Sequence, residues 1–115
     1  MQQESLRSAR IFWPRFNRGQ LVARLREQLP ELARALPLRR VVLFGSWAAG
    51  RATAFSDVDV LVVYADPPRT DAFQRVQRTL EVRGLEPHVY AESEAARVQD
   101  TLDRMTRHGI DLLAD

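Results

Sequence analysis

Two short apolar runs, separated by a turn that contains glycine and serine, constrain the fold of this chain more than any other feature. The first run covers residues 41–44, and the second covers residues 58–64. Short apolar runs that are bounded by turn residues are typical of buried strands. We therefore expect residues 45–57 to connect the ends of two such strands.

Helical and strand-like segments alternate along the rest of the chain. Leucines recur at helical spacing after Asn17, a candidate N-cap, although Pro30 is expected to break this run into two shorter helices. A second helix is expected after a cap at Thr70 or Asp71, with Phe73, Val76 and Leu80 on its inward face. A strand over 85–90 follows. Ser93 is expected to cap a last helix that buries Val98, and residues 110–113 could add a short edge strand. The pattern predicts an α/β (α+β) domain with a small mixed sheet of three to four strands flanked by helices.

Within the turn, Gly45 and Ser46 have the properties of a phosphate-binding site. Glycine lets the backbone approach a phosphate closely, and Ser46 offers a hydroxyl and a backbone N–H at the start of a short helical turn. Arg51 is a candidate for neutralising phosphate charge, and Ser56 for orienting the turn into the second strand. We interpret these four residues as nucleotide- and phosphate-binding.

Two carboxylates, Asp57 and Asp59, follow at the start of the second strand. Because they are two residues apart, their side chains leave the same face of a strand, while Val58 and Val60 point into the core. Two anions this close favour a shared divalent cation, and such carboxylates hold metal ions in nucleotidyl transfer. We predict that they bind Mg²⁺, which prefers a few carboxylates, waters and phosphate oxygens.

A third carboxylate from a neighbouring strand commonly completes such a site, and Glu86 is the candidate, as a metal ligand or a general base. The alternative is that Glu86 is a surface charge, because the adjacent Pro87 indicates an irregular strand or an edge strand. His88 lies on the same face, and a histidine there is more often packed or hydrogen-bonded than catalytic.

Composition narrows the class of protein. The 115 residues suit one domain, and the absence of cysteine leaves oxygen or imidazole as the metal ligands. No apolar stretch approaches the roughly 20 residues that span a bilayer, so we expect no membrane association and a cytoplasmic location. All basic residues are arginine, and residues 1–40 hold nine Arg and three Glu, a net charge of +6. This basic region could attract a triphosphate or an acidic partner.

The first 16 residues form a separate arm, which carries the apolar cluster Ile11, Phe12, Trp13 and Phe16. It either packs on the domain or docks a partner, and unchanged partner binding after deletion of residues 1–16 would exclude docking. Such exposed apolar residues are compatible with a homo- or hetero-oligomer.

At the residues of the turn and the paired carboxylates, the chain resembles the minimal nucleotidyltransferases of the polymerase-beta superfamily. Their pattern is Gly-Ser, ten residues, then Asp-x-Asp, which here runs from Gly45-Ser46 to Asp57-Val58-Asp59. The resemblance implies a polymerase-beta-like nucleotidyltransferase fold, with an arm over 1–16 and a minimal nucleotidyltransferase domain over 17–115.

Family members of the MntA-like kind are antitoxins that are often encoded beside a HEPN-domain RNase toxin. The resemblance implies an enzyme that uses ATP and Mg²⁺ to attach AMP to a tyrosine of the toxin. Asp57, Asp59 and Glu86 would be its catalytic residues and metal ligands. Two alternatives stay open: an antitoxin that blocks its partner without catalysis, and nucleotidyl transfer to a small molecule such as an aminoglycoside. Direct nucleic-acid binding is not expected, because no RNA-reading motif is present.

Overall fold

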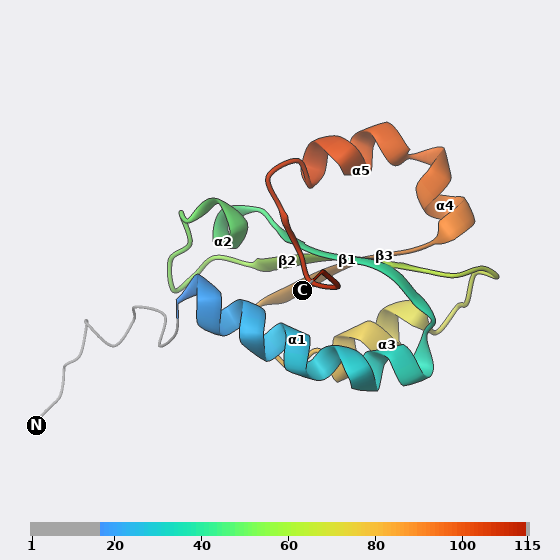
Figure 1. Cartoon of the computed structure of the whole chain (residues 1–115), viewed down its shortest axis with the longest axis horizontal. Helices are drawn as coiled ribbons and strands as arrows, with labels where there is room; N and C mark the ends of the chain where they lie inside the picture. Colours follow the sequence, from blue (N-terminus) through green and yellow to red (C-terminus); the bar gives the residue numbers. More distant parts are fainter. Residues whose placement is uncertain (1–16, 115) are drawn as a thin grey trace, which may run out of the picture.

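The computed structural model describes residues 17–114, so the proposed arm over 1–16 lies outside the described residues. The elements follow in the order α1 (Arg18–Ala35), β1 (Leu38–Phe44), α2 (Ser46–Ala49), β2 (Val58–Tyr64), α3 (Ala72–Thr79), β3 (Leu85–Ala91), α4 (Glu92–Arg97), α5 (Gln99–Met105) and β4 (Ile110–Asp111). Figure 1 shows the sheet between two helical layers, with α1 and α3 on one side and α4 and α5 on the other.

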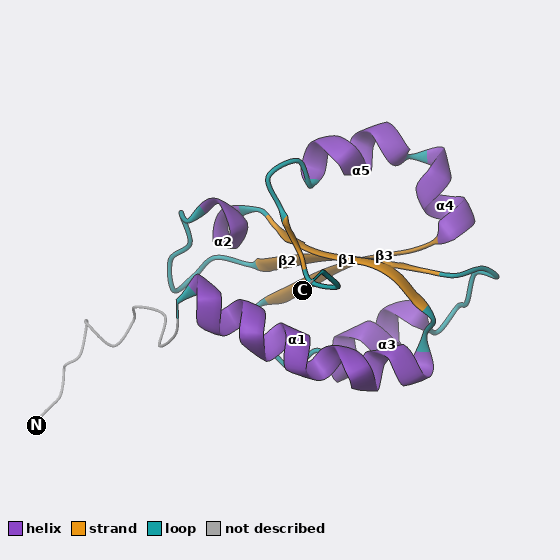
Figure 2. Cartoon of the chain, viewed as in Figure 1, coloured by secondary structure: helices purple, strands orange, loops and turns teal. Residues whose placement is uncertain are grey.

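The four strands form one mixed sheet in the order β3-β2-β1-β4. β1 pairs antiparallel with both β2 and β4, whereas β2 and β3 are parallel and are connected through α3. A parallel pair needs such a crossover, which here crosses the face of the sheet that α1 also covers (Figure 2). The predicted mixed sheet flanked by helices is confirmed, and β3 is an edge strand, as Pro87 indicated.

Alternate residues of the strands enter two different apolar clusters. On β2, Val60 and Val62 belong to a large cluster that includes the leucines of α1. Leu61 and Val63 point to the opposite face and join a smaller cluster with Leu102 of α5. Since successive side chains of a strand point to opposite faces, one strand contributes to both clusters.

The expectation that Pro30 divides the first helix is wrong. α1 is continuous over Arg18–Ala35 with Pro30 inside it. A proline within a helix costs about 3 kcal/mol, because it removes one hydrogen bond and crowds the preceding turn. The buried leucines on both sides of Pro30 form one core-facing stripe, and we infer that their burial offsets this cost: Leu21, Leu25, Leu29 and Leu32.

The start of α1 follows the sequence prediction. The side chain of Asn17 accepts a hydrogen bond from the N–H of Gln20 at 2.9 Å, and the Gln20 side chain accepts one from the N–H of Asn17 at 2.8 Å. This reciprocal pair is a capping box, which satisfies two N–H groups that have no partner within the helix.

Two details of the later helices differ from the expectation. Val76 and Leu80 are buried as predicted, but Phe73 is 46% exposed, because Ala72, four residues before Val76, takes the inward position instead. Ser93 does not cap a long final helix. Its hydroxyl and N–H instead donate to the carboxylate of Asp66, at 2.8 and 3.1 Å.

The expected final helix is two helices, α4 and α5, which meet at a break at Val98. Val98 is 38% exposed, which contradicts its predicted inward position. The expected edge strand over 110–113 pairs only over Ile110–Asp111, although Leu112 is buried. No helix within residues 17–114 combines the length and the apolar character needed to cross a membrane.

Candidate active site

The turn after β1 brings the two halves of the sequence motif together. Gly45 has φ 78° and ψ −152°, a conformation that favours glycine, and it precedes the short helix α2. A Cβ atom added to Gly45 would lie 3.3 Å from Cγ of Asp59 and closer still to its Oδ2. Glycine is therefore required both by the backbone angle and by the neighbouring carboxylate, and the phosphate-binding candidate lies directly against the acidic strand.

The loop between α2 and β2 is ordered by its own hydrogen bonds. The hydroxyl of Ser56 accepts from the N–H of Thr53 at 2.8 Å, and the N–H of Ser56 donates to the carbonyl of Thr53 at 3.1 Å. The N–H of Val58 then donates to the carbonyl of Gly84 at 2.8 Å, which ties the start of β2 to the start of β3. Ser56 thus lies in the turn that delivers the two aspartates.

Two arginines lie beside this turn. The N–H of Arg51 donates to the carbonyl of Ser46 at 2.9 Å, and Arg51 is exposed. The guanidinium of Arg18, at the start of α1, donates to the carbonyl of Ala48 in α2 at 2.6 Å. Sequence reasoning did not find Arg18, because only the packing of α1 beside α2 brings it to this turn.

Asp59 occupies the centre of the candidate site. It lies opposite Phe44 of β1 and opposite Glu86 of β3 in the strand register. Its side chain is on the same face as Leu61 and is 26% exposed. Asp57 lies one residue before β2 and is exposed, as is Glu86.

His88 contacts Asp59, a relationship that the sequence did not predict. Its Nε2 lies 3.4 Å from Oδ1 of Asp59. The imidazole also packs against Phe44, with ring centroids 5.0 Å apart and ring planes tilted by 58°. The parallel register between β2 and β3 places His88 beside Leu61, two residues beyond the Asp59–Glu86 pair, and this offset could not be read from one sequence.

The expected metal ligands are not gathered into a closed cluster. Within residues 17–114, no group of three histidine, aspartate or glutamate side chains is close enough together to hold a metal ion. The oxygen donors of Asp57, Asp59 and Glu86 nevertheless suit Mg²⁺, which uses few protein ligands and retains water and phosphate oxygens. The contact between Asp59 and Gly45 places one donor beside the turn expected to bind phosphate.

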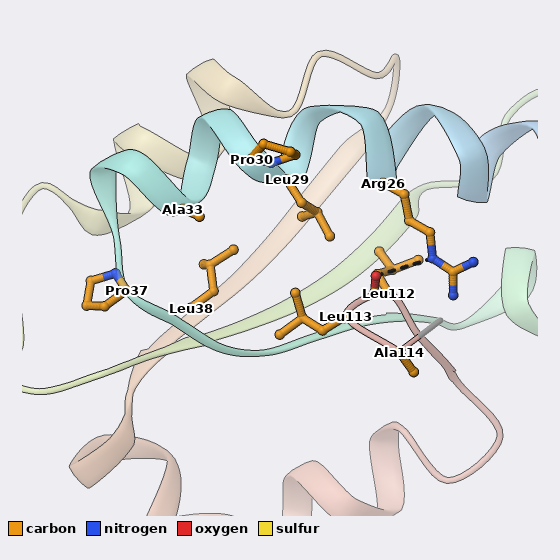
Figure 3. Close-up of a pocket in the computed structure, with 9 residues that line it drawn as sticks. All are labelled: Arg26, Leu29, Pro30, Ala33, Pro37, Leu38, Leu112, Leu113 and Ala114. Atoms are coloured by element: carbon orange, nitrogen blue, oxygen red, sulfur yellow. Dashed lines mark hydrogen bonds between the residues drawn. The ribbon is translucent and has the colours of Figure 1, made fainter.

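An apolar groove of about 590 Å³ lies elsewhere, between α1, the start of β1 and the C-terminal residues (Figure 3). Pro30, Leu38 and Leu113 contribute to its walls. At its edge the guanidinium of Arg26 donates to the carbonyl of Leu112 at 3.2 Å. Among residues 17–114, no residue of the candidate site lines this groove, and none of the described lining residues carries a carboxylate.

Within the part of the chain that the structure describes, one carboxyl group has a shifted pKa, and it also lies away from the site. Hydrogen bonds from Arg75, and then from Arg69, lower the pKa of Asp71 below its ordinary value. Asp71 stands at the start of α3, where these two ion pairs fix the end of the loop that follows β2. The shifted pKa of Asp71 therefore results from ion pairs that support the fold, and Asp71 is not part of the candidate site.

Known proteins resemble this chain in sequence and in fold. A family described as "Nucleotidyltransferase domain" matches residues 22–110. Comparison with curated proteins gave no match. Among solved structures, the chain is similar to a candidate nucleotidyltransferase from Sulfolobus solfataricus, with 25% identity and a TM-score of 0.55 over 82% of this chain and 80% of that one.

A second similar structure is a toxin–antitoxin protein crystallised with AMP-PNP. It shares 23% identity and a TM-score of 0.54 over 76% of this chain and 71% of that chain, and it supports the fold. The family match covers more than half of the chain and includes the turn at Gly45, both aspartates and Glu86. The chain therefore belongs to the nucleotidyltransferase domain family.

Proposed function

We propose that this protein is a Mg²⁺-dependent adenylyltransferase that transfers AMP from ATP to a hydroxyl group of a partner protein. The observation that carries the proposal is the direct approach of Gly45 to Asp59, which brings the turn expected to bind phosphate beside a carboxylate expected to bind metal. Membership of the nucleotidyltransferase family supports the class of reaction.

Each residue of the site has a role that follows from its position. The first N–H groups of a helix have no partner within the helix, so the backbone and hydroxyl of Ser46 would hold phosphate oxygens. Arg51, beside the same turn, would neutralise phosphate charge. Ser56 would keep the loop in the form that presents Asp57 and Asp59. These two carboxylates, with Glu86, would hold Mg²⁺, which when bound neutralises charge on the triphosphate.

In the reaction, the acceptor oxygen attacks the α-phosphorus of ATP. The bond between the α-phosphorus and the oxygen that bridges to the β-phosphate breaks, and pyrophosphate leaves. The acceptor hydroxyl loses its proton, and the exposed Glu86 is the group that would accept it. Placing these groups in line is the main contribution of the protein to such a transfer.

Two observations support a protein acceptor. Asp57 and Glu86 are exposed, and Asp59 is partly exposed, so an acceptor on a macromolecule can reach them from solvent. One of the similar structures is a toxin–antitoxin protein crystallised with an ATP analogue. We therefore propose an antitoxin role, in which a tyrosine of a HEPN-type RNase toxin receives the AMP.

The test is the intact mass of the protein encoded beside this one, after co-expression with the wild-type chain or with Asp57→Asn/Asp59→Asn. Glu27→Gln/Asp100→Asn, which changes two exposed carboxylates outside the site, is the matched control. The proposal predicts a mass increase of one or more AMP units with the wild type and with the control, and none with the site variant.

Two results would contradict it. No mass increase with any variant, while the two proteins still co-purify, indicates an antitoxin that only blocks its partner. A mass increase that persists in the Asp57→Asn/Asp59→Asn variant would show that these carboxylates are not the site.

A further inference from the structure

We infer that His88 is a positioning residue that sets the orientation of the Asp59 carboxylate. The inference rests on the proposed function, because it concerns the way in which the protein holds one of the proposed metal ligands. It assigns a role to a residue outside the Gly-Ser and Asp-x-Asp motif.

The two oxygens of Asp59 face different neighbours. Oδ1 lies 3.4 Å from Nε2 of His88. Oδ2 is the atom nearest to the position that a Cβ of Gly45 would occupy. A carboxylate oxygen can only accept a hydrogen bond from the ring, so a hydrogen bond in this contact requires the hydrogen on Nε2. The contact with His88 therefore directs Oδ2 toward the turn that would bind phosphate.

His88 is itself held in place. Its ring packs against Phe44, with centroids 5.0 Å apart, and Phe44 is only 8% exposed. Phe44 is the residue immediately before Gly45. The contacts therefore run from Phe44 to His88, from His88 to Asp59, and from Asp59 back to Gly45, and they join the ends of β1 and β2 with β3.

A distance of 3.4 Å is longer than the usual 2.9–3.0 Å of an N–H···O bond, so this contact is at most a weak hydrogen bond. Hydrogen bonds of this kind often tighten only when the ligand binds. Groups that orient a metal ligand typically change metal affinity about 10- to 100-fold when they are removed. The expected effect of His88 is therefore on metal affinity, with the fold left intact.

The experiment measures Mn²⁺ binding, as a spectroscopic substitute for Mg²⁺, by electron paramagnetic resonance in the presence of AMP-PNP. His88→Leu removes the donor and keeps an apolar side chain against Phe44, whereas His88→Gln supplies an amide N–H in place of Nε2–H. We expect about tenfold weaker Mn²⁺ binding for His88→Leu and a loss of at most about threefold for His88→Gln. Thermal unfolding of both variants is measured alongside.

The outcomes separate a positioning role from a structural one. Equal losses in the Leu and Gln variants, or wild-type affinity in the Leu variant, would overturn the inference. Asp59→Asn serves as the reference: if it abolishes Mn²⁺ binding while His88→Leu does not weaken it, the metal site stands and only the role of His88 fails. If Asp59→Asn binds Mn²⁺ like the wild type, the proposed site fails, and the inference fails with it.

Discussion

The two faces of the sheet differ in their cover and in their side chains. The face toward α1 and α3 packs a large apolar cluster, in which Leu25, Val60 and Tyr64 are almost fully buried. The face toward α4 and α5 (Figure 1) has a small apolar cluster. The candidate site lies at the end of that face where β2 starts, because Asp59 is the second residue of β2 and contacts His88. Because residues alternate between the faces, the same strands stabilise the fold on one side and present the site on the other.

The largest expected effect comes from removing one buried leucine from each face. Leu43 belongs to the large cluster and Leu61 to the small one, and both are fully buried. We expect Leu43→Ala to lower the free energy of unfolding by about 3–5 kcal/mol, and Leu61→Ala by about 2–3 kcal/mol, since a thinner layer can collapse around the cavity more easily. Denaturant unfolding measures both, and equal losses would contradict the asymmetry between the faces.

The next effect concerns Gly45, the residue of the turn that lies against the carboxylate of Asp59. Gly45→Ala should lower the free energy of unfolding by about 1–3 kcal/mol through backbone strain, and should also abolish nucleotide binding by displacing Asp59. Gly50→Ala is the matched control, because Gly50 also has φ +78° but meets only the side chain of Arg18, at 4.0 Å. A control that lost AMP-PNP binding as completely as Gly45→Ala would refute the specific role of the Gly45–Asp59 contact.

A smaller effect tests whether Pro30 destabilises α1, the helix whose leucines belong to the large apolar cluster. Pro30 is exposed within α1, and Pro30→Ala restores an N–H that can donate to the carbonyl of Arg26. We expect the free energy of unfolding to rise by about 1 kcal/mol, with nucleotide binding unchanged, as thermal unfolding would show. A clear loss of stability would mean that the proline ring supports the groove in Figure 3.

The smallest effect is expected at the loop that leads to the site. Phe55 is 88% exposed, and its N–H donates to the hydroxyl of Thr53 at 3.2 Å. Phe55→Ala leaves that backbone bond in place, so the free energy of unfolding should change by less than about 0.5 kcal/mol. A larger loss in denaturant unfolding would show that Phe55 contributes packing despite its exposure.

The strands and the motif could be predicted from local pattern. The apolar run over 58–64 became β2 without a change of boundary, because a central strand buried on both faces reads as a continuous apolar run. The continuity of α1 through Pro30 could not be predicted, because burial of the surrounding leucines outweighs local preference.

The features of the candidate site also divide into those that local spacing predicts and those that depend on strand register. The prediction that Asp57 and Asp59 share one face rests on their spacing, which is a local property, and it stays a prediction because Asp57 lies before β2. The approach of Gly45 to Asp59 depends on the antiparallel register between β1 and β2, and the contact of His88 depends on the parallel register between β2 and β3. Register arises from the packing of whole strands, so these contacts had no signal in the spacing of residues.

The most direct test of the account is to map the binding of AMP-PNP with Mg²⁺ onto the ¹⁵N-labelled protein by nuclear magnetic resonance. We predict that the largest backbone shifts occur at Gly45, Ser46 and Asp59, with smaller ones along β3, and that Asp57→Asn/Asp59→Asn abolishes them. Shifts confined to the groove lined by Leu29 and Leu113, or shifts that persist in the double variant, would contradict a nucleotide site at Gly45 and Asp59.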